Sequence, residues 1–532
     1  MTDKQTPYVL PEHVSRTIGR DAQRNNILAA KIVADIIKTT LGPEGMDKML
    51  VDSTGEVIVT NDGVTILEEM EIDHPAAKML VEIAKAQEAE VGDGTTTAAL
   101  LAGKLLEYGE VLLDRKLHPT VIVKGYKLAA EKAGIILNEL SVPANNEGIL
   151  ENIAKTAMTG KGAESNKEKL AGLLVKAVSL VAEGREISLS NIKIQKLKGE
   201  GVGDSELLEG IVIDKERANS AMPSVVKEAR ILLTDFPLEL RSPEMEAKIE
   251  VSSPEQLESF LASEEKYLKA MTEKIVTSGA NVVFCQKGID DVVQYYLAQA
   301  GILACRRVSK TDLELISRAT GGKILSNLHD IHASSFGEAE VVEEVKKGDE
   351  GYLFIRGCAN PKAVTLIVRG ATEHVVDEIE RAVKDGLGDL VATIKSGKIV
   401  AGGGAVEIEL SKRLRSFAKT LGGREQLAVE EFAHALESIP ESLAENAGLD
   451  PMDILAELRK RHEAGLYNYG LNLFKDCIED TMQAGIIEPL KVKEQAISSA
   501  SEVATMILRI DDVLVSRGSS SSSGQNKYEG MD

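Results

Sequence analysis

The sequence predicts a protein of several domains, with mainly helical ends and a centre that mixes helices with strands. The first observation is length, because 532 residues are too many for one compact hydrophobic core. The second is that residues up to about 140 and after about 402 carry aliphatic side chains at helical spacing. The third is that short apolar strands such as 231–233, 282–284 and 353–355 alternate with helical segments between 214 and 365. That alternation indicates an α/β or α+β module.

Charge and composition narrow the classes of partner. The chain carries a net charge of −22, and aromatic residues make up only 3% of it, with no tryptophan. An acidic protein repels the phosphate backbone and anionic lipids, and few rings are present on which bases could stack. We therefore expect no nucleic acid and no membrane as a main partner. The four cysteines form no C-x-x-C pair and the start shows no apolar export signal, so we expect a cytoplasmic protein.

The helical N-terminal region begins with an amphipathic helix predicted over 21–41, which Leu41-Gly42-Pro43 ends. A hairpin is predicted next, with strands at 48–51 and 57–59. Asn61-Asp62-Gly63 then predicts a tight turn, with the carboxylate of Asp62 at a loop apex.

Two further predicted helices, 76–90 and 98–113, enclose the sequence Val91-Gly92-Asp93-Gly94-Thr95-Thr96-Thr97. The glycines allow a tight turn and a close approach of the backbone to a ligand. The threonines open a helix, where hydroxyls, unpaired N–H groups and the helix dipole favour an anion. Asp93 is a hard oxygen ligand suited to Mg²⁺ that is shared with phosphates. The segment predicts a phosphate-binding turn, although an ordinary N-capped turn shares the pattern and no G-x-x-x-x-G-K-[ST] motif occurs.

The central region begins with a linker at 142–145 and helices through 182, within which Thr159-Gly160-Lys161 predicts an exposed loop. Strands at 191–197 and 207–213 follow, and the glycine cluster between them predicts a loose hairpin turn. A dinucleotide-binding fingerprint would require a helix directly after those glycines, and a strand is predicted there instead.

A charged helix is predicted from Ser253-Pro254 to about Val276. Its apolar stripe consists of Leu257, Phe260, Leu261, Leu268, Met271 and Ile275. The stripe could face a core, or it could belong to a projecting arm whose apolar tip meets another polypeptide.

The C-terminal region contains a long helix with Asp385, a strand at 398–400, and Gly402-Gly403-Gly404 before another helix. Three glycines before a helix N-terminus predict a second place where backbone can touch a ligand closely. Residues 517–532, rich in serine, are expected to be a disordered tail.

In this order, the motifs resemble the chaperonin family over about residues 10–515, and within it the group II chaperonins. The resemblance is carried by the following segments: Leu41-Gly42-Pro43, Asn61-Asp62-Gly63-Val64-Thr65-Ile66-Leu67, Gly92-Asp93-Gly94-Thr95-Thr96-Thr97, Gly402-Gly403-Gly404 and Ile487-Glu488-Pro489. Group II is favoured by Thr159-Gly160-Lys161, the inserted segment near 245–276 and the ending Ile510-Asp511-Asp512-Val513-Leu514.

The resemblance implies a chaperonin fold of three domains. A mainly α-helical equatorial domain would comprise 1–144 and 402–516. An α+β intermediate hinge domain would comprise 145–213 and 366–401. An α/β apical domain would comprise 214–365, with a helical protrusion at about 245–276 that serves as a built-in lid.

The resemblance also implies the functional residues. Nucleotide would be held by Leu41, Gly42, Pro43, Gly94, Thr95, Thr96, Thr97, Thr159, Gly160, Lys161, Gly403 and Glu488, with Glu488 at the adenosine end. Asp93 would bind Mg²⁺, and Asp385 would be the general base or would position the attacking water, with Asp62 assisting. Lys161 would sense the γ-phosphate or its loss. Leu257, Phe260 and Leu261 would meet the substrate at the lid. The sequence departs from the family at the glycine-rich Gly386-Leu387-Gly388-Asp389-Leu390 and at Lys475-Asp476, where Thr-Gly is usual.

The implied function is an ATP-driven folding chamber built of two stacked rings, in which hydrolysis closes the lid over a non-native protein. The cofactors would be ATP and Mg²⁺, and the partners would be non-native proteins together with copies of itself or paralogous subunits. Two alternatives are a passive holdase scaffold with a degenerate nucleotide site and a small-molecule ATP-dependent enzyme. The second would need a dedicated acceptor pocket, for which the sequence shows no candidate residues.

Overall fold

A computed structural model describes residues 14–516, except for residues 52, 56, 145, 185, 200, 241–252, 349 and 360. The chain folds into two compact units: both of its ends, up to Pro143 and from Lys398, form the first, and Ala144–Gly397 forms the second. The predicted tail 517–532 and the first part of the predicted arm, 245–252, lie outside the described residues. Among the described helices, none has the length and apolar character needed to cross a membrane.

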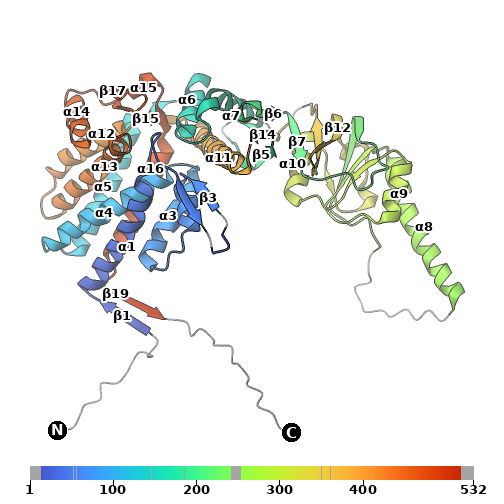
Figure 1. The fold of residues 1–532 in the computed structure, drawn as a ribbon, viewed down its shortest axis with the longest axis horizontal. Coiled ribbons are helices and arrows are strands. Elements are labelled where there is room, and N and C mark those ends of the chain that lie inside the picture. Colours follow the sequence, from blue (N-terminus) through green and yellow to red (C-terminus); the bar gives the residue numbers. More distant parts are fainter. Residues whose placement is uncertain are drawn as a thin grey trace, which may run out of the picture. The chain divides into compact units, whose positions relative to one another are not determined.

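The first unit is mainly helical, with short paired strands (Figure 1). Its elements from the N-terminal side are β1 (Val14–Ile18), α1 (Arg20–Lys38), β2 (Lys48–Val51), β3 (Val57–Thr60), α2 (Gly63–Glu69), α3 (Pro75–Val91), α4 (Thr95–Asp114), α5 (Pro119–Leu140) and β4 (Val142–Pro143). Those from the C-terminal side are β15 (Lys398–Ala401), α12 (Ala405–Ala418), α13 (Glu425–Asn446), α14 (Pro451–Glu463), β16 (Tyr469–Asn472), β17 (Cys477–Asp480), α15 (Thr481–Ala484), β18 (Ile487–Pro489), α16 (Leu490–Leu508) and β19 (Asp512–Ser516).

Strand pairing joins the two ends of the chain. The predicted hairpin is confirmed, because β2 pairs antiparallel with β3. Strand β1 pairs with β19, and the two lie side by side in Figure 1. Strand β15 lies between β18 and β4, with Val400 opposite Glu488. Helix α1 stops at Lys38, three residues before the predicted end, because Thr39 caps it and the chain turns at Thr40.

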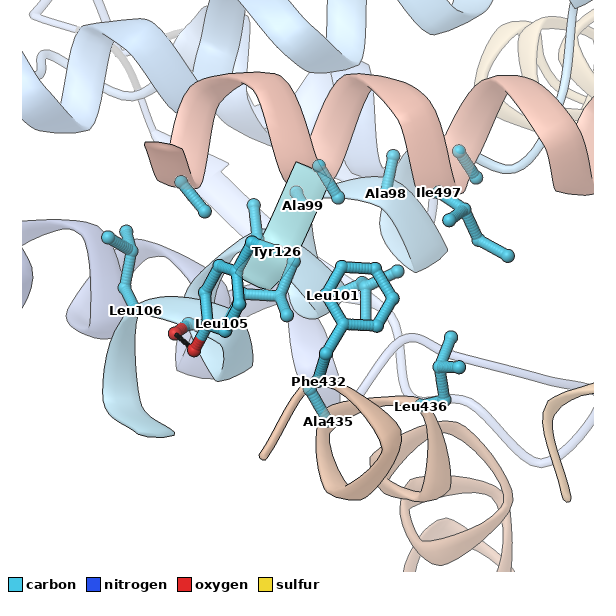
Figure 2. Packing of buried hydrophobic residues seen from close by; sticks show 14 of the residues in the cluster. Ala98, Ala99, Leu101, Leu105, Leu106, Tyr126, Phe432, Ala435, Leu436 and Ile497 are labelled. Atoms are coloured by element: carbon cyan, nitrogen blue, oxygen red, sulfur yellow. Dashed lines mark hydrogen bonds between the residues drawn. The ribbon is translucent and has the colours of Figure 1, made fainter. Parts of the chain in front are cut away.

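One large aliphatic core holds the first unit together. It is lined by α1, α3, α4 and α5 from one end of the chain and by α12, α13 and α16 from the other. Figure 2 shows Tyr126 and Phe432 at its centre, with ring centroids 5.6 Å apart in an edge-to-face arrangement. The hydroxyl of Tyr126 donates to the carbonyl of Leu105 at 2.8 Å, so the ring is buried without an unsatisfied polar group.

The second unit combines helices with two sheets. Its helices are α6 (Glu147–Met158), α7 (Lys167–Val181), α8 (Pro254–Ser278), α9 (Asp291–Gln299), α10 (Lys310–Thr320) and α11 (Glu373–Ser396). Its strands are β5 (Ile192–Lys198), β6 (Glu206–Leu208), β7 (Gly210–Ile213), β8 (Val225–Thr234), β9 (Val282–Cys285), β10 (Leu303–Cys305), β11 (Ile324–Leu325), β12 (Gly337–Lys347), β13 (Glu350–Arg356) and β14 (Val364–Gly370). Across both units, the described residues mix helix and sheet and are mostly helical.

The strands of the second unit do not all pair as predicted. One sheet has the order β10-β9-β8-β12-β13-β7, with β11 beside β8. The predicted hairpin between 191–197 and 207–213 is wrong: β5 and β6 both pair with β14, which lies between them, and β7 joins the larger sheet. Local turn chemistry could not reveal this, because the strand that separates them is about 160 residues further along the chain. No α-helix follows the glycine cluster directly, as predicted: after a 3₁₀ turn at Val202–Asp204 comes β6.

Candidate functional site

The predicted phosphate-binding turn joins α3 to α4. Gly92 ends α3 in the left-handed region with φ of 83°, and Gly94, with φ of 79°, is the N-cap of α4. Glycine adopts both conformations without steric cost. Thr95 is buried, whereas Asp93, Thr96 and Thr97 are half-buried. The first-turn N–H groups of α4 have no acceptor within the helix, so the turn presents donors at the positive end of a 20-residue helix.

Asp62 does not lie at a loop apex, which corrects the predicted tight turn. It is the N-cap of α2, and its carboxylate accepts from N–H of Thr65 at 2.9 Å and from the hydroxyl of Thr65 at 2.6 Å. The neighbouring Gly63 packs against α4, because a Cβ atom there would lie 2.6 Å from Oγ1 of Thr96 and 3.3 Å from its backbone nitrogen. Two of the motifs that the sequence singled out therefore meet in space.

The glycine run 402–404 is tied to β16 and β18. A Cβ atom at Gly402 would lie 3.1 Å from Oε1 of Glu488, and N–H of Gly402 donates to Ile486 at 2.9 Å. Gly403, with φ of 63°, accepts from N–H of Leu471 at 2.8 Å, and a Cβ atom on it would lie 2.5 Å from the Leu471 carbonyl oxygen. A side chain at Gly402 would displace Glu488, which is predicted to bind nucleotide. A side chain at Gly403 would displace the backbone of Leu471.

The segment Leu41-Gly42-Pro43 is half-buried and belongs to the same region of the first unit. A Cβ atom at Gly42 would lie 2.4 Å from Cδ2 of Leu443 and 3.9 Å from Cδ1 of Leu473. The carbonyl of Leu41 accepts from Nδ2 of Asn446 at 2.9 Å. Because Leu443 and Leu471 share one small apolar cluster, this segment is connected to Gly403 through side chains of α13 and β16.

Two residues that sequence reasoning missed connect these segments. Gln87 is fully buried and donates from Nε2 to the carbonyls of Asp93 at 3.0 Å and Val492 at 3.3 Å. Lys493 is buried as well, and its ammonium lies 2.7 Å from Oε1 of Glu407 and 2.8 Å from Oε2 of Glu488. A polar residue on the apolar stripe of a helix was the available signal for Gln87, which follows Leu80, Ile83 and Ala84 on the buried face of α3.

Negative charge exceeds positive charge around Glu488 and Lys493. Burial raises the pKa of Glu488, the ammonium of Lys493 opposes that rise, and the charges of Glu407 and Asp93 add to it. Burial by itself would lower the pKa of Lys493, but the carboxylates of Glu407 and Glu488 outweigh it and raise that pKa. Of the charged groups named here, three are acids and one is a base, so a cation bound at Asp93 would reduce a local excess of negative charge.

The other predicted catalytic residues belong to the second unit. Lys161 follows the left-handed Gly160 after α6 and forms an ion pair with Asp385 of α11. Their side chains are 18% and 14% exposed, so the loop 159–161 is half-buried, and its predicted exposure is wrong. The same loop is attached to α11 a second time, because N–H of Gly162 donates to Oε1 of Glu378 at 2.8 Å. Sequence spacing could not reveal the ion pair, which spans 224 residues.

Both departures from the family pattern are accommodated. A Cβ atom at Gly386 would lie 2.8 Å from Cδ1 of Leu174, so the glycine lets α11 pack closely on α7. Asp476 has φ of 49°, a conformation in which glycine is favoured and aspartate is among the tolerated residues.

Helix α8 supports both interpretations of its apolar stripe, each over a different stretch. Leu268, Met271 and Ile275 are buried in the core beneath the larger sheet. Phe260 and Leu261 are 39% and 55% exposed. The side chain of Leu257 lies outside the described residues, although the helix backbone there is described. The helix is thus anchored by its C-terminal half, and apolar side chains nearer its N-terminus remain exposed.

Within the described residues, no group of three or more His, Cys, Asp or Glu side chains could hold a metal ion. The four cysteines are free, and Cys477 is half-buried whereas the other three are buried. Burial raises the pKa of Cys305 to about 12 and that of Cys358 to about 11. Thiols with such pKa values are poor nucleophiles near neutral pH.

The comparisons with known proteins agree with the arrangement of motifs. Residues 33–517 match the TCP-1/cpn60 chaperonin family, and the chain belongs to that family. It is similar to the thermosome subunit of Methanopyrus kandleri, with 54% identity over 97% of this chain and 96% of the relative. It is also similar to the thermosome subunit beta of Methanothermobacter thermautotrophicus, with 54% identity over 100% and 99% of the two chains. A thermosome subunit of Pyrococcus abyssi is 53% identical over 96% and 94%.

Proposed function

We propose that the chain is a subunit of an ATP-dependent molecular chaperone, a folding chamber of two stacked rings that hydrolysis of ATP closes. The observation that carries the proposal is the contact of Gly63 with Thr96 at the N-terminus of α4. It brings the segments 62–63 and 94–97, both characteristic of a nucleotide-dependent family, into one place. Membership of the chaperonin family and similarity to thermosome subunits support the same function.

The proposed nucleotide site is formed by the first unit. Its phosphates would be held by Leu41, Gly42, Pro43, Gly94, Thr95, Thr96, Thr97 and Gly403. Glu488 would bind the adenosine end. Asp93 fits a magnesium ligand, since it is half-buried directly before the α4 N-terminus, where an ion would adjoin phosphates held by that helix. Bound Mg²⁺ supplies neutralisation of phosphate charge.

Asp385 is proposed to accept the proton of the attacking water at its carboxylate, with Asp62 assisting, and Lys161 to report the presence of the γ-phosphate through the loop 159–161. These assignments rest on the family resemblance. The ion pair between Lys161 and Asp385 supports them, because it couples the proposed base directly to the proposed sensor. Positioning and charge neutralisation account for most of the catalysis of phosphoryl transfer, so few groups are required.

We propose equatorial, intermediate and apical domains with the boundaries predicted from the sequence, a cytoplasmic location, and rings made of this chain or paralogous subunits. Non-native proteins would bind apolar surface at the lid helix α8, including Phe260 and Leu261. Unfolded chains expose apolar segments without a fixed sequence, so exposed apolar side chains suit such clients.

The substitution Asp385→Ala tests the assigned chemistry. We expect ATP affinity to change little and steady-state hydrolysis to fall about 10²- to 10⁴-fold, the usual contribution of a general base. Asp377→Ala is the matched control, because Asp377 also lies on α11 and pairs with a lysine, Lys196, at 2.8 Å. It should retain wild-type turnover.

Three outcomes would redirect the proposal. Undiminished hydrolysis by the Asp385→Ala protein would refute the base assignment. Suppression of aggregation that is equally effective with and without ATP would favour a passive holdase. A particle that remains a monomer in native solution would exclude the ring chamber, whereas a particle many times larger than one chain is expected.

A further inference from the structure

Lys493 is a buried lysine, and burying its charge costs free energy that some benefit must offset. Its side chain is 7% exposed in the first turn of α16, and Glu407, one of its two partners, is 2% exposed. Burying an ion pair often stabilises a protein no more than apolar side chains of similar volume would. Glu407 is not even fully satisfied, since its Oε2 is buried without a hydrogen-bond partner among the described residues. Stability is therefore a weak reason for this arrangement.

The location of Lys493 suggests a different reason. It connects Glu407, in the first turn of α12 after the glycine run, with Glu488 of β18. Glu488 uses Oε2 for the ammonium, while its Oε1 lies on the side of Gly402. The carboxylate is thus held by Lys493 at one oxygen, and the side chain as a whole remains 24% exposed.

The residue before Lys493 contacts the other end of the proposed nucleotide site. A Cβ atom at Gly94 would lie 2.8 Å from Cγ1 of Val492, and the Val492 carbonyl accepts from Gln87, which also donates to the carbonyl of Asp93. Two consecutive residues of α16 thus contact both the phosphate-binding turn and the carboxylate at the adenosine end. The phosphate-binding turn and Glu488 therefore contact adjacent residues of the same helix.

We propose that Lys493 is a positioning residue for the nucleoside: it holds Oε2 of Glu488 so that Oε1 accepts a hydrogen bond from a ribose hydroxyl. This inference rests on the proposed nucleotide site and adds to it a residue that acts only through Glu488. Glu407 fixes the ammonium from the opposite side. The triad therefore sets the distance between the ribose contact and the phosphates held at 94–97.

The test compares binding of ATP with binding of inorganic tripolyphosphate, both with Mg²⁺, to the full-length protein by calorimetry. Lys493→Met should weaken ATP binding about tenfold, the equivalent of one hydrogen bond to a charged group, and leave tripolyphosphate binding within about twofold. Lys104→Met is the control, because Lys104 is a half-buried lysine of α4 paired with Glu107 at 2.8 Å. It should bind both ligands as the wild type does.

A double substitution separates positioning from charge balance. Lys493→Met with Glu407→Gln removes one buried charge of each sign, so it should fold even where the single variant does not. The proposal expects it to retain the tenfold loss for ATP alone. Recovery of wild-type ATP affinity, or an equal loss for both ligands, would overturn the proposal. Glu407→Gln by itself keeps a side-chain oxygen that can accept from the ammonium, so Lys493 should stay on Glu488 and ATP affinity should hold. A tenfold loss there would also overturn the proposal. Failure of wild-type protein to bind ATP would instead refute the proposed function.

Discussion

The two units bury their apolar side chains in different ways. In the first unit, one large cluster runs from Ile27 to Leu508 and joins helices from both ends of the chain. In the second, helices α6, α7 and α11 have a cluster of their own, and the larger sheet has one cluster on each face. Alternate residues of β9 show this, because Phe284 belongs to one face and Val283 to the other.

This difference in core packing has consequences for the rigidity of each unit. One large core makes the helices that line it depend on one another, which suits a site assembled from segments hundreds of residues apart. Separate cores allow parts of the second unit to open with different free energies. The proposed lid helix α8 is anchored in only one of those clusters.

The largest effect is expected from removing a central ring. Phe432→Ala should destabilise the first unit by about 3–5 kcal/mol, since the ring is fully buried and packs on Tyr126. Phe284→Ala removes an equally buried ring from the second unit and should cost about as much locally. Urea unfolding gives the total loss, and hydrogen exchange measured by mass spectrometry shows where it falls.

The two variants should differ in how many helices lose protection from hydrogen exchange. Phe432→Ala should raise exchange in α1, α4, α5 and α16 together, whereas Phe284→Ala should leave α6 and α7 protected. Equal loss of protection in α6 and α7 after Phe284→Ala would mean that the separate clusters of the second unit unfold as one.

A smaller effect concerns acid stability of the first unit. Glu437 is buried and accepts from Ser411 at 2.8 Å, Arg415 at 2.7 Å and Arg459 at 2.5 Å. Burial by itself would raise the pKa of Glu437, but these partners outweigh it and hold the pKa below its ordinary value of 4.5. Its contribution is therefore present above pH 4.5 and is lost as pH falls below that value through the folded pKa.

Glu437→Gln should accordingly cost about 1.5–3 kcal/mol at pH 7, the value of hydrogen bonds to a charged group. The unfolding free energy of the variant should then decline less than that of the wild type below pH 4.5. Denaturant titrations at several pH values measure both. Parallel decline of the two proteins would show that Glu437 is not among the groups that set acid stability.

Helical glycines give a finer comparison. A Cβ atom at Gly103 of α4 would lie 2.3 Å from Cβ of Ala34, so Gly103→Ala should destabilise by about 1–3 kcal/mol through overpacking of α1 on α4. Gly134 of α5 has nothing within 4 Å of its Cβ position, and Gly134→Ala should stabilise by about 0.5–1 kcal/mol. Thermal unfolding of the two variants gives opposite shifts.

The second unit also has one crowded and one open helical glycine. Gly386 of α11 faces the end of the flexible side chain of Leu174, so Gly386→Ala should cost less than Gly103→Ala. Gly172 of α7 is open, like Gly134. A larger loss at Gly386 than at Gly103 would contradict the idea that the first unit is the less adaptable of the two.

The smallest effect on stability is expected at the exposed part of α8. The double variant Phe260→Ser, Leu261→Ser should change the unfolding free energy by less than about 0.5 kcal/mol, as is usual at the surface. It should nevertheless bind a denatured client protein several-fold more weakly, as measured by suppression of aggregation. Met452→Ser is the control, because Met452 is 75% exposed on α14 of the first unit. Equal loss in both proteins would remove the special role of α8.

Elements formed by neighbouring residues could be read from the sequence. Aliphatic spacing predicted α3 and α4 within a few residues of their bounds, and turn residues predicted the hairpin of β2 and β3. The glycines and threonines at 92–97 were predicted to join two helices, and they do. The assignments of Asp385, Lys161, Asp93 and Glu488 came from resemblance to a family and stay predictions.

Helix period, turn chemistry and capping act over a few residues, so local patterns were enough to predict most of the individual helices and strands. The tertiary structure was needed to show that β14 separates β5 from β6 and that Lys161 pairs with Asp385. It alone revealed Lys493 between Glu407 and Glu488. Most of these contacts join residues far apart in the chain, and no local pattern records which of many compatible partners a buried charge or strand edge will meet.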